Sequence, residues 1–445
     1  MTTSPGALLT LEIEKPAAGG RMIARHQGQI VLVSGAIPGE QVQARVERTG
    51  KGVIFAEAVD VVTASPDRRD GTPDWRCGGN VLAHIAYPRQ LQLKGEIIRD
   101  ALGRIGRVPL AATPEVIGSP EQGYRMRARL HADHGRLGFY REGTHQLCDP
   151  ATTGQLLPST LEWIEALERL MRDQQLHGLV GLELTENVSA DQRACHLELH
   201  GGVHAGPFAA LTAAGALTGV SAERADRQGV EVLFGEPFVV DVLNPGGRGV
   251  DLHGPPVSVL HLRRDVRAFF QGNRYLLDRL VQHVMGLVPD GPVVDLYAGV
   301  GLFGLSLAAA GRTDVTLVEN DPVAGADLQR NADPFRAHVQ VLRTSVEAFV
   351  HSAGLHGQAR PTDVVGSTYI VDPPRTGISR DALAGIIAQQ PARLVYVSCD
   401  VATLARDART LIDAGYELGS LTGLDLFPNT AHVETVVVFR REGAH

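Results

Sequence analysis

Long apolar runs are missing from this chain of 445 residues, and no stretch approaches the length that a membrane-spanning helix needs. Its first residues also lack the basic start and apolar core of a secretory signal peptide. Cysteine is scarce, since Cys77, Cys148, Cys195 and Cys399 are widely scattered, and this argues against a disulfide framework. These absences predict a globular protein of the cytoplasm with no membrane partner.

An excess of positive charge is missing too. The formal net charge is −8, which by itself counts against a nucleic-acid partner. Arginines nevertheless gather in two places, between residues 121 and 141, where Arg125, Arg127 and Arg129 alternate along a predicted strand, and between residues 263 and 279. A basic groove can coexist with an acidic periphery, so the net charge does not exclude RNA.

The pattern of elements divides the chain into three regions. Residues 1–65 read as short strands broken by glycine, which predicts a small OB-like β-barrel. Residues 66–255 predict a mixed α+β domain, whose helix at about 90–105 is expected to pack on the last region. Residues 256–445 alternate strands with helices, which is typical of a Rossmann-like α/β fold with a parallel, doubly wound sheet.

A glycine-rich turn follows the apolar strand that ends near residue 296. Gly299, Gly301 and Gly304 satisfy G-x-G-x-x-G, and Glu319 ends the next strand, where a ribose-binding acid is expected. These residues alone allow a dinucleotide-binding oxidoreductase. Asp295 precedes the first glycine by four residues, and an acid there repels a pyrophosphate but can serve a cationic, amino-acid-bearing cofactor. The turn therefore favours S-adenosylmethionine over a nicotinamide cofactor.

A rigid acidic loop is predicted at residues 372–375, which read Asp-Pro-Pro-Arg after an apolar strand. Prolines cannot continue a strand ladder, so they fix a loop that presents Asp372 at the strand's carboxyl end. We expect this strand to be the fourth after the glycine turn. Nucleic-acid methyltransferases carry related loops against a base at this position.

Cys399 lies 27 residues after Asp372, at the end of another apolar strand. Neighbouring strands of an open α/β sheet bring such ends together at a ligand site. A helix is predicted to begin just beyond Cys399, and its N-terminus is expected to lower the thiol pKa and make a competent nucleophile. Glu434 heads a later apolar strand, where burial raises the pKa of a carboxyl toward that of a general base.

These segments together resemble one family, the S-adenosylmethionine-dependent RNA 5-methyluridine methyltransferases with an N-terminal TRAM barrel. The matching segments are residues 269–273 (FFQGN), 295–301 (DLYAGVG), 372–377 (DPPRTG), 397–400 (VSCD) and 427–434 (FPNTAHVE). Residues 124–130 and 135–140 are similar to the family's middle domain. The resemblance is nearly full-length and is strongest in the ribosomal RNA branch of the family.

The resemblance implies a role for each candidate residue. Cys399 attacks carbon 6 of a uracil, carbon 5 accepts the methyl group, and Glu434 removes the carbon 5 proton. Cofactor-binding positions would be Gln271, Tyr297, Gly299, Gly301, Glu319 and Asp372. Substrate-binding positions would be Phe269 or Phe270 stacking on a flipped base, Pro373 and Arg375 of the acidic loop, and Arg125, Arg127 and Arg129 at the phosphates.

Two departures from the family pattern stand out. Many members hold an iron–sulfur cluster on four cysteines, but here the corresponding positions include Gly71, Cys77 and Asn80, with Cys148 near the fourth. Because a cluster takes four thiolates, we predict that none forms and that the chain binds no metal. The second departure is Asp400 after Cys399, a negative charge that is expected to raise the thiol pKa somewhat.

The substrate is expected to be 23S ribosomal RNA first, and the T-loop uridine of transfer RNA second. A catalytically silent RNA-binding assembly factor remains a rival, because it also explains the barrel and the arginines. An oxidoreductase explains the glycine turn but gives Cys399, Asp372 and Glu434 no joint role. The exact uridine and the number of sites are not encoded in any local motif, and a monomer is the default expectation.

Overall fold

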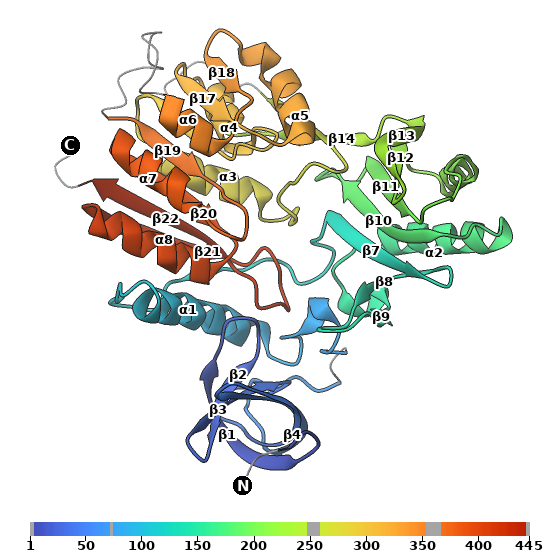
Figure 1. Cartoon of the computed structure of the whole chain (residues 1–445), viewed down its shortest axis with the longest axis vertical. Coiled ribbons are helices and arrows are strands. Elements are labelled where there is room, and N and C mark those ends of the chain that lie inside the picture. Colours follow the sequence, from blue (N-terminus) through green and yellow to red (C-terminus); the bar gives the residue numbers. More distant parts are fainter. Residues whose placement is uncertain (1–3, 72–73, 247–258, 353–365, 442–445) are drawn as a thin grey trace.

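The protein is described by a computed structural model that covers residues 4–71, 74–246, 259–352 and 366–441. Three bodies are visible in Figure 1: a barrel at the bottom, a mostly antiparallel sheet on the right, and a helix-covered sheet at the upper left. The expected fold class, an α/β methyltransferase-like body with a barrel and a mixed α+β body, is confirmed.

The N-terminal body is a closed barrel with strand order β1-β2-β3-β5-β4. Its strands are β1 (Leu8–Pro16), β2 (Met22–His26), β3 (Gln29–Ser34), β4 (Gln41–Gly50) and β5 (Val53–Thr63). Inward residues alternate with outward ones, as in β1 and β4, so the barrel is filled by side chains such as Leu11, Val31 and Val42. Closure leaves this small sheet without edges.

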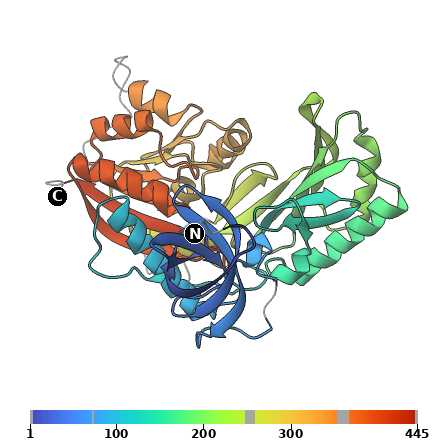
Figure 2. The ribbon, with the colours of Figure 1, turned by 60° about the horizontal axis from the view of Figure 1, so that its bottom comes forward.

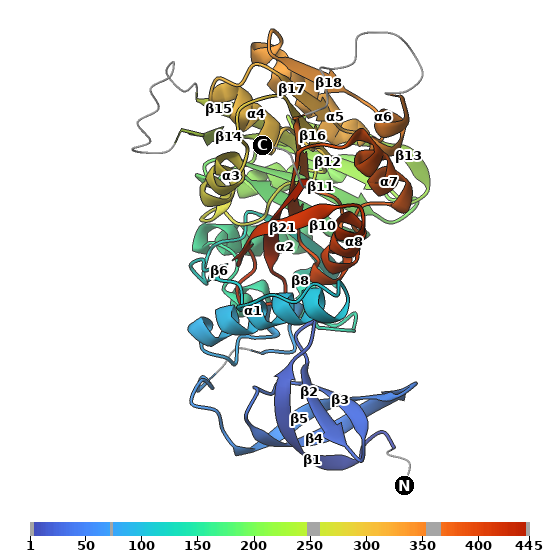
Figure 3. The ribbon, with the colours of Figure 1, turned by 90° about the vertical axis from the view of Figure 1, so that its left-hand side faces the viewer.

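A connecting segment joins the barrel to both other bodies. It contains the short helix η1 (Gly78–Asn80), α1 (Tyr87–Arg104) and the two-residue strand β6 (Val116–Ile117). Ile97, Ile98 and Ala101 of α1 pack in one core with Leu404 and Ala405 of α8 (Val401–Asp413). Figure 3 shows α1 between the barrel and α8.

The middle body is a seven-stranded sheet with order β13-β12-β11-β10-β7-β8-β9. Its strands are β7 (Arg127–Asp133), β8 (Arg136–Tyr140), β9 (Leu147–Cys148), β10 (Leu179–Glu186), β11 (Arg193–Leu199), β12 (Gly219–Arg224) and β13 (Arg227–Gly235). The helix α2 (Pro158–Asp173) and the 3-10 segments η2 (Pro150–Thr153) and η3 (Gly206–Ala214) belong to this body. Trp163 and Leu167 of α2 join Phe208 of η3 in its core.

The C-terminal body is an eight-stranded sheet with order β18-β17-β16-β19-β20-β22-β21-β6. Its strands are β16 (Val293–Leu296), β17 (Val315–Val318), β18 (Val339–Leu342), β19 (Thr368–Val371), β20 (Arg393–Ser398), β21 (Tyr416–Leu424) and β22 (Glu434–Arg441). One face is covered by α3 (Leu277–Gly286), α4 (Leu302–Ala309), α5 (Pro322–Ala332) and η4 (Asp333–Phe335), and the other by α1, α6 (Val346–Ser352), α7 (Arg380–Gln389) and α8.

The order of these strands differs from the sequence expectation in two ways. β19, which precedes the acidic loop, is the third strand after the glycine turn among the described residues and not the fourth, because β17 and β18 are the strands described between them. The sheet is parallel from β18 to β20, and β22 then lies antiparallel between β20 and β21. The chain reverses direction in the loop between β21 and β22, so β21 runs in the same direction as β20.

The division at residues 65 and 255 stays a prediction, and two pairings between the described strands cross the second boundary. The strand β6 adds to β21 through the pairs Gly423–Val116 and Leu424–Ile117. The strand β14 (Phe238–Leu243) pairs antiparallel with β15 (Leu260–Asp265). Buried charges tie the same bodies together, as in the Arg264–Asp241 pair at 2.6 Å. Figure 2 shows the barrel in front, with the C-terminal body on the left and the middle body on the right.

No helix in the described ranges is both long enough and apolar enough to pass through a membrane.

Candidate active site

The glycine turn links the end of β16 to the start of α4. Tyr297, Gly299 and Gly301 all have positive φ angles, of 60°, 58° and 100°. A Cβ on Gly301 would lie 2.5 Å from a Leu305 methyl, whereas a Cβ on Gly299 would meet nothing within 4 Å. Gly301 is therefore required by packing, and Gly299 leaves the backbone open for close approach of a ligand.

Asp295 lies beneath this turn and does not face a ligand directly. Its side chain is fully buried, and Oδ2 accepts a hydrogen bond of 2.8 Å from the Gly304 N–H in the first turn of α4. Oδ1 has no hydrogen-bond partner among the described residues. Burial raises the pKa of Asp295 to about 8, and Asp372 and Glu319 add to the rise. Asp295 thus supports the loop and places a negative field below it, and its service to a cationic cofactor stays a prediction.

Glu319 connects the ends of β16 and β17. Its Oε2 accepts from the Gly299 N–H at 2.7 Å, and its Oε1 accepts from the Asp321 N–H at 2.6 Å. A carboxylate oxygen has more than one lone pair, so both oxygens can still accept from ribose hydroxyls. The position matches the ribose-binding acid expected from the sequence.

The acidic loop begins where β19 ends, directly beside the end of β16. The Gln271 amide donates to Asp372 Oδ2 at 3.2 Å and so fixes the carboxyl from a separate segment of the chain. Burial raises the pKa of Asp372 to about 7, although the Gln271 hydrogen bond opposes the rise. The structure therefore brings Gln271 and Asp372 together, while Pro373 is buried and Arg375 is exposed in the turn that follows.

Cys399 and Glu434 face each other across two paired strands. β20 and β22 are antiparallel with Ser398 opposite Thr435, so the next position of each strand sets Cys399 against Glu434. Glu434 is 2% exposed, and its Oε1 has no hydrogen-bond partner in the described ranges. Burial and then the Asp372 charge raise the pKa of Glu434 well above its usual value, as the sequence led us to expect of a buried base.

The expected lowering of the thiol pKa is wrong for the free protein. Burial, followed by the charge of Glu434, raises the pKa of Cys399 to about 11, and the Arg375 guanidinium only partly opposes this. The N-terminus of α8 does not lower the thiol pKa, because its free N–H groups are taken by Asp400. The Asp400 carboxylate accepts from the N–H groups of Ala402 and Thr403 at 3.0 and 2.8 Å. Asp400 thus acts as the helix cap.

Only one of the two adjacent phenylalanines is available to a base. Phe269 is 62% exposed, and the Arg127 guanidinium carbon lies 6.0 Å from its ring centre. Phe270 is 5% exposed and belongs to the core, with Arg264 at 4.5 Å from its ring. Of the two, Phe269 is the one exposed enough to stack on a base, and its role there stays a prediction; burial removes Phe270 as an alternative.

The three arginines of the middle body are not free cations. Arg127 pairs with Glu183 at 3.0 Å and Arg129 with Glu198 at 2.6 Å, while Arg125 donates to the Gln155 side chain at 2.6 Å. These partners lie on distant strands or loops, so the sequence around each arginine does not indicate them. Phosphates must compete with these acids for Arg127 and Arg129, which weakens but does not remove their attraction for RNA.

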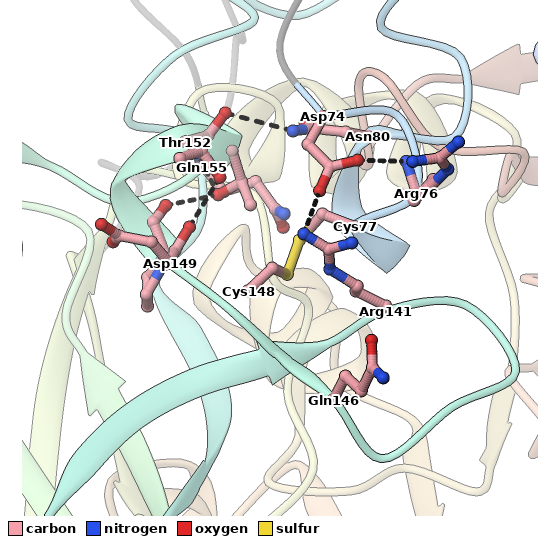
Figure 4. The surroundings of a disulfide bond; sticks show 12 residues. Asp74, Arg76, Cys77, Asn80, Arg141, Gln146, Cys148, Asp149, Thr152 and Gln155 are labelled. Atoms are coloured by element: carbon pink, nitrogen blue, oxygen red, sulfur yellow. Dashed lines mark hydrogen bonds and ion pairs between the residues drawn. A yellow bond between two sulfur atoms is a disulfide. The ribbon is translucent and has the colours of Figure 1, made fainter.

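Two cysteines that the sequence left unpaired form a disulfide. Cys77 precedes η1, Cys148 ends β9, and their sulfur atoms are bonded (Figure 4). A 2.8 Å ion pair between Asp74 and Arg141 lies beside the bond. The expectation of no disulfide is therefore wrong, because the fold brings together residues that are 71 positions apart. No group of three metal-ligating side chains occurs in the described part of the chain, and the absence of a cluster stays a prediction.

Two residues that the sequence analysis missed lie under the loop before Glu434. Gln90 and Lys94 of α1 are fully buried and donate hydrogen bonds to Asn429 and Asp425. A signal was present, since polar residues one helical turn apart continue the face that carries Ile97 and Ile98.

Comparisons with known proteins identify the family to which the chain belongs. The sequence model of the tRNA (Uracil-5-)-methyltransferase family matches residues 257–442, and that of the TRAM domain matches residues 3–59. A protein of Azoarcus sp. named 23S rRNA (uracil(1939)-C(5))-methyltransferase RlmD is 31% identical over 97% of this chain and 99% of its own length. The chain belongs to the RNA uracil-C5 methyltransferase family.

Other relatives agree with this assignment. The Pseudomonas putida protein of the same name as the Azoarcus relative is 31% identical, over 96% of this chain and 93% of its own. The crystal structure of Pyrococcus abyssi tRNA (uracil-54, C5)-methyltransferase in complex with S-adenosyl-L-homocysteine matches with a TM-score of 0.72 and 23% identity, covering 97% of this chain and 100% of that one. This family member is an S-adenosylmethionine-dependent RNA (uracil-C5) methyltransferase.

The carboxyls at the strand ends fit this cofactor. Asp295, Asp372 and Glu434 all have raised pKa values, and two of them carry an oxygen without a hydrogen-bond partner among the described residues. A site of this kind is short of positive charge, and a sulfonium with an ammonium group supplies it. Gly299, Glu319, Asp372 and Gln271 are the residues that would hold the cofactor.

Proposed function

We propose that this enzyme methylates carbon 5 of a uridine in 23S ribosomal RNA through a covalent adduct of Cys399 with carbon 6. The observation that carries the mechanism is the opposition of Cys399 and Glu434 across β20 and β22, beside Asp372 and Arg375. The two full-length relatives at 31% identity, both named as 23S ribosomal RNA enzymes, support the choice of substrate.

The thiolate of Cys399 forms a bond to carbon 6 of the uracil, and the electron pair of the carbon 5–carbon 6 double bond moves toward the carbonyl at carbon 4. Carbon 5 thereby becomes nucleophilic. The Arg375 guanidinium favours the thiolate, since its charge lowers the pKa of Cys399 against the effects of burial and Glu434. S-adenosylmethionine supplies the methyl group as an electrophilic carbon on a positive sulfur.

Glu434 completes the reaction. Its carboxylate removes the proton from carbon 5, the carbon 5–carbon 6 double bond re-forms, and the bond from carbon 6 to the Cys399 sulfur breaks. Burial suits this role, because a base with a raised pKa accepts a proton near neutral pH. The methyl group has then moved from sulfur to carbon 5, the carbon 5 proton passes from Glu434 to solvent, and the released thiolate regenerates the enzyme.

The target base must leave its stack to reach these groups. Phe269 is exposed beside Arg127 and offers the face on which a base can stack. We propose that the barrel of residues 1–65 and the middle region of residues 66–255 bind the surrounding RNA, that Arg125, Arg127 and Arg129 contribute to its phosphate contacts, and that the enzyme works as a monomer in the cytoplasm.

The test is methyl transfer from labelled S-adenosylmethionine to unmodified 23S ribosomal RNA and, in parallel, to unmodified transfer RNA, with identification of the product nucleoside. Native enzyme and Cys195→Ala should form 5-methyluridine in the ribosomal RNA, and Cys399→Ala should form none. Cys195 is the matched control because it is the other free cysteine and lies in the core of the middle body. Label in transfer RNA alone would reverse the choice of substrate, and label in neither would favour the silent RNA-binding alternative.

A further inference from the structure

The loop between β21 and β22, residues 425–433, carries the chain into Glu434, and its internal hydrogen bonds join only near neighbours in the sequence. They include Phe427 N–H to Asp425 Oδ1 at 3.2 Å and Thr430 N–H to the Phe427 carbonyl at 3.2 Å. Within it, Thr430 Oγ1 donates to the Phe427 carbonyl at 2.7 Å, and His432 N–H donates to Thr430 Oγ1 at 3.2 Å. Asn429 adopts a left-handed conformation with φ of 64°. A loop of this kind requires partners from elsewhere in the chain to hold one conformation.

Gln90 of α1 supplies one partner. Its side-chain Nε2 donates to Asn429 Oδ1 at 2.9 Å, and its Oε1 accepts from the Asn429 backbone N–H at 3.0 Å. The same Nε2 also donates to the Ile85 carbonyl at 2.9 Å, which fixes the orientation of the amide. Gln90 is fully buried, so water does not replace these bonds if they are lost.

Lys94, one helical turn further along α1, supplies the second partner. Its Nζ lies 2.5 Å from Asp425 Oδ1 and donates to the Phe427 carbonyl at 3.1 Å. Both charged side chains are 0% exposed. Lys94 is one of only three lysines in the sequence, with Lys15 and Lys51, so this buried point charge stands out in a chain that otherwise uses arginine.

The Lys94–Asp425 pair is better explained by its effect on the position of the loop than by a gain in the free energy of unfolding. Taking two charges out of water costs several kcal/mol per ion, and well-packed apolar residues of similar volume are often equally or more stable. An ion pair, however, fixes a direction and a distance, which apolar contacts do not. Four further hydrogen bonds act on the same loop: from Leu82 N–H to the Asn429 carbonyl, from the Tyr124 hydroxyl to the Pro428 carbonyl, from the Asn273 amide to the Leu426 carbonyl, and from the Asp425 N–H to the Ile117 carbonyl.

We propose that Gln90 and Lys94 are positioning residues for the methylation reaction. Their hydrogen bonds hold residues 425–433 in one conformation, and this loop positions Glu434 toward the base that is bonded to Cys399. This proposal rests on the proposed function for its catalytic part. It also makes α1, which lies outside the matched methyltransferase region of residues 257–442, a component of the active site.

The experiment uses the full chain and variants that remove polar groups but keep volume. Gln90→Met removes the amide, and Gln92→Met is its control on the exposed side of the same helix. Lys94→Met with Asp425→Asn removes both buried charges together, so that no charge is left unpaired. Lys15→Met is the control for this pair, because Lys15 forms a surface ion pair with Asp100 of α1.

The first readout, hydrogen exchange of backbone amides, does not depend on activity. Exchange at residues 425–434 should rise on the order of tenfold in both test variants, the change that loss of a buried hydrogen bond permits. Exchange at the glycine turn, residues 297–304, and the affinity for S-adenosylhomocysteine should not change. Asn429→Gly keeps the left-handed backbone and removes the side-chain partner, so its effect should not add to that of Gln90→Met.

The second readout is steady-state methylation. We expect kcat to fall about 10-fold to 100-fold, as for a misplaced catalytic group, with KM for RNA unchanged. Because Glu434 acts after carbon 5 is methylated, the variants should also accumulate a denaturation-resistant RNA–protein adduct. Unchanged exchange at residues 425–434, or faster exchange with an unaltered kcat and no adduct, would overturn the proposal. Wild-type enzyme that makes no 5-methyluridine would overturn the proposed function and the catalytic part of this inference, whereas exchange would still decide whether α1 holds the loop.

Discussion

Binding of S-adenosylmethionine should release protons, because the site that receives this cation holds carboxyls that are partly protonated. The pKa of Asp372 is raised to about 7 and that of Asp295 to about 8, both by burial first. At pH 7, about half of the Asp372 carboxyls and about nine-tenths of the Asp295 carboxyls then carry a proton. A cation favours the ionised form, so at pH 7 we expect release of between about 0.5 proton, if only Asp372 responds, and about 1.4 protons, if both do.

The sign of the pH dependence follows. The ionised carboxylates dominate above their pKa values, so affinity for the cation rises with pH between about 6 and 8, by up to about tenfold per pH unit for each proton released. Without ligand, the same carboxyls make the free energy of unfolding fall as pH rises. Between the ordinary aspartate pKa of 3.8 and about 7, the folded state binds more protons than the unfolded state, so stability falls across this window, by about 4 kcal/mol for Asp372 alone.

The assay is isothermal titration calorimetry in buffers of different ionisation enthalpy, from which proton release is obtained directly. S-adenosylhomocysteine is the matched ligand, since it lacks the positive sulfur and should release fewer protons. Asp372→Asn should reduce the release at pH 7 by about half a proton, the share carried by Asp372. Equal proton release with both ligands, or none with S-adenosylmethionine, would refute the electrostatic reasoning about this site.

Four further outcomes are expected. Glu434→Gln should retain adduct formation but slow its breakdown by about 100-fold to 10,000-fold, seen as an RNA–protein band on denaturing gels, and rapid turnover would contradict its role as the base. Because burial raises the pKa of Cys399 to about 11, the rate of adduct formation should increase with pH from about 6 to 9, and a flat profile in single-turnover experiments would argue against the free thiol as the limiting group. Phe269→Leu should raise KM for RNA about 5-fold to 100-fold, matching the loss of one stacking contact, without changing S-adenosylhomocysteine affinity. Cys77→Ser with Cys148→Ser should lower the free energy of unfolding by up to about 4 kcal/mol under oxidising conditions, and denaturation with reductant present should remove the difference from wild type.

The groups that line the strand ends were predictable because each is encoded locally. An apolar strand followed by glycines, by two prolines, or by a cysteine marks a carboxyl end, and parallel neighbours bring such ends together. Gly299, Asp372 and Cys399 therefore lie where the sequence places them. The N-cap formed by Asp400 was also predictable, since an aspartate before a helix is a common N-cap. The sequence analysis considered only the effect of its charge on the thiol.

The remaining differences depend on contacts between distant parts of the chain. Phe269 and Phe270 are adjacent and chemically identical, and only the packed core decides which of them is exposed. The partner of Arg129 is Glu198, on another strand, and no local pattern indicates it. The pairing of Cys77 with Cys148 has the same origin, because their approach follows from how the β8–β9 hairpin meets η1.

The short strand β6 has a consequence for how the enzyme is made. Chains emerge from the ribosome with the N-terminus first, so Val116 and Ile117 are synthesised well before β21, the strand with which they pair. A nascent chain that stops before Tyr416 lacks β21, so β6 has no strand with which to pair. Helix α1 likewise has no complete packing partner until α8 has been synthesised. Contacts between the beginning and the end of a chain are slow to form. The C-terminal sheet is therefore completed last, after all residues of the barrel and the middle body have been synthesised.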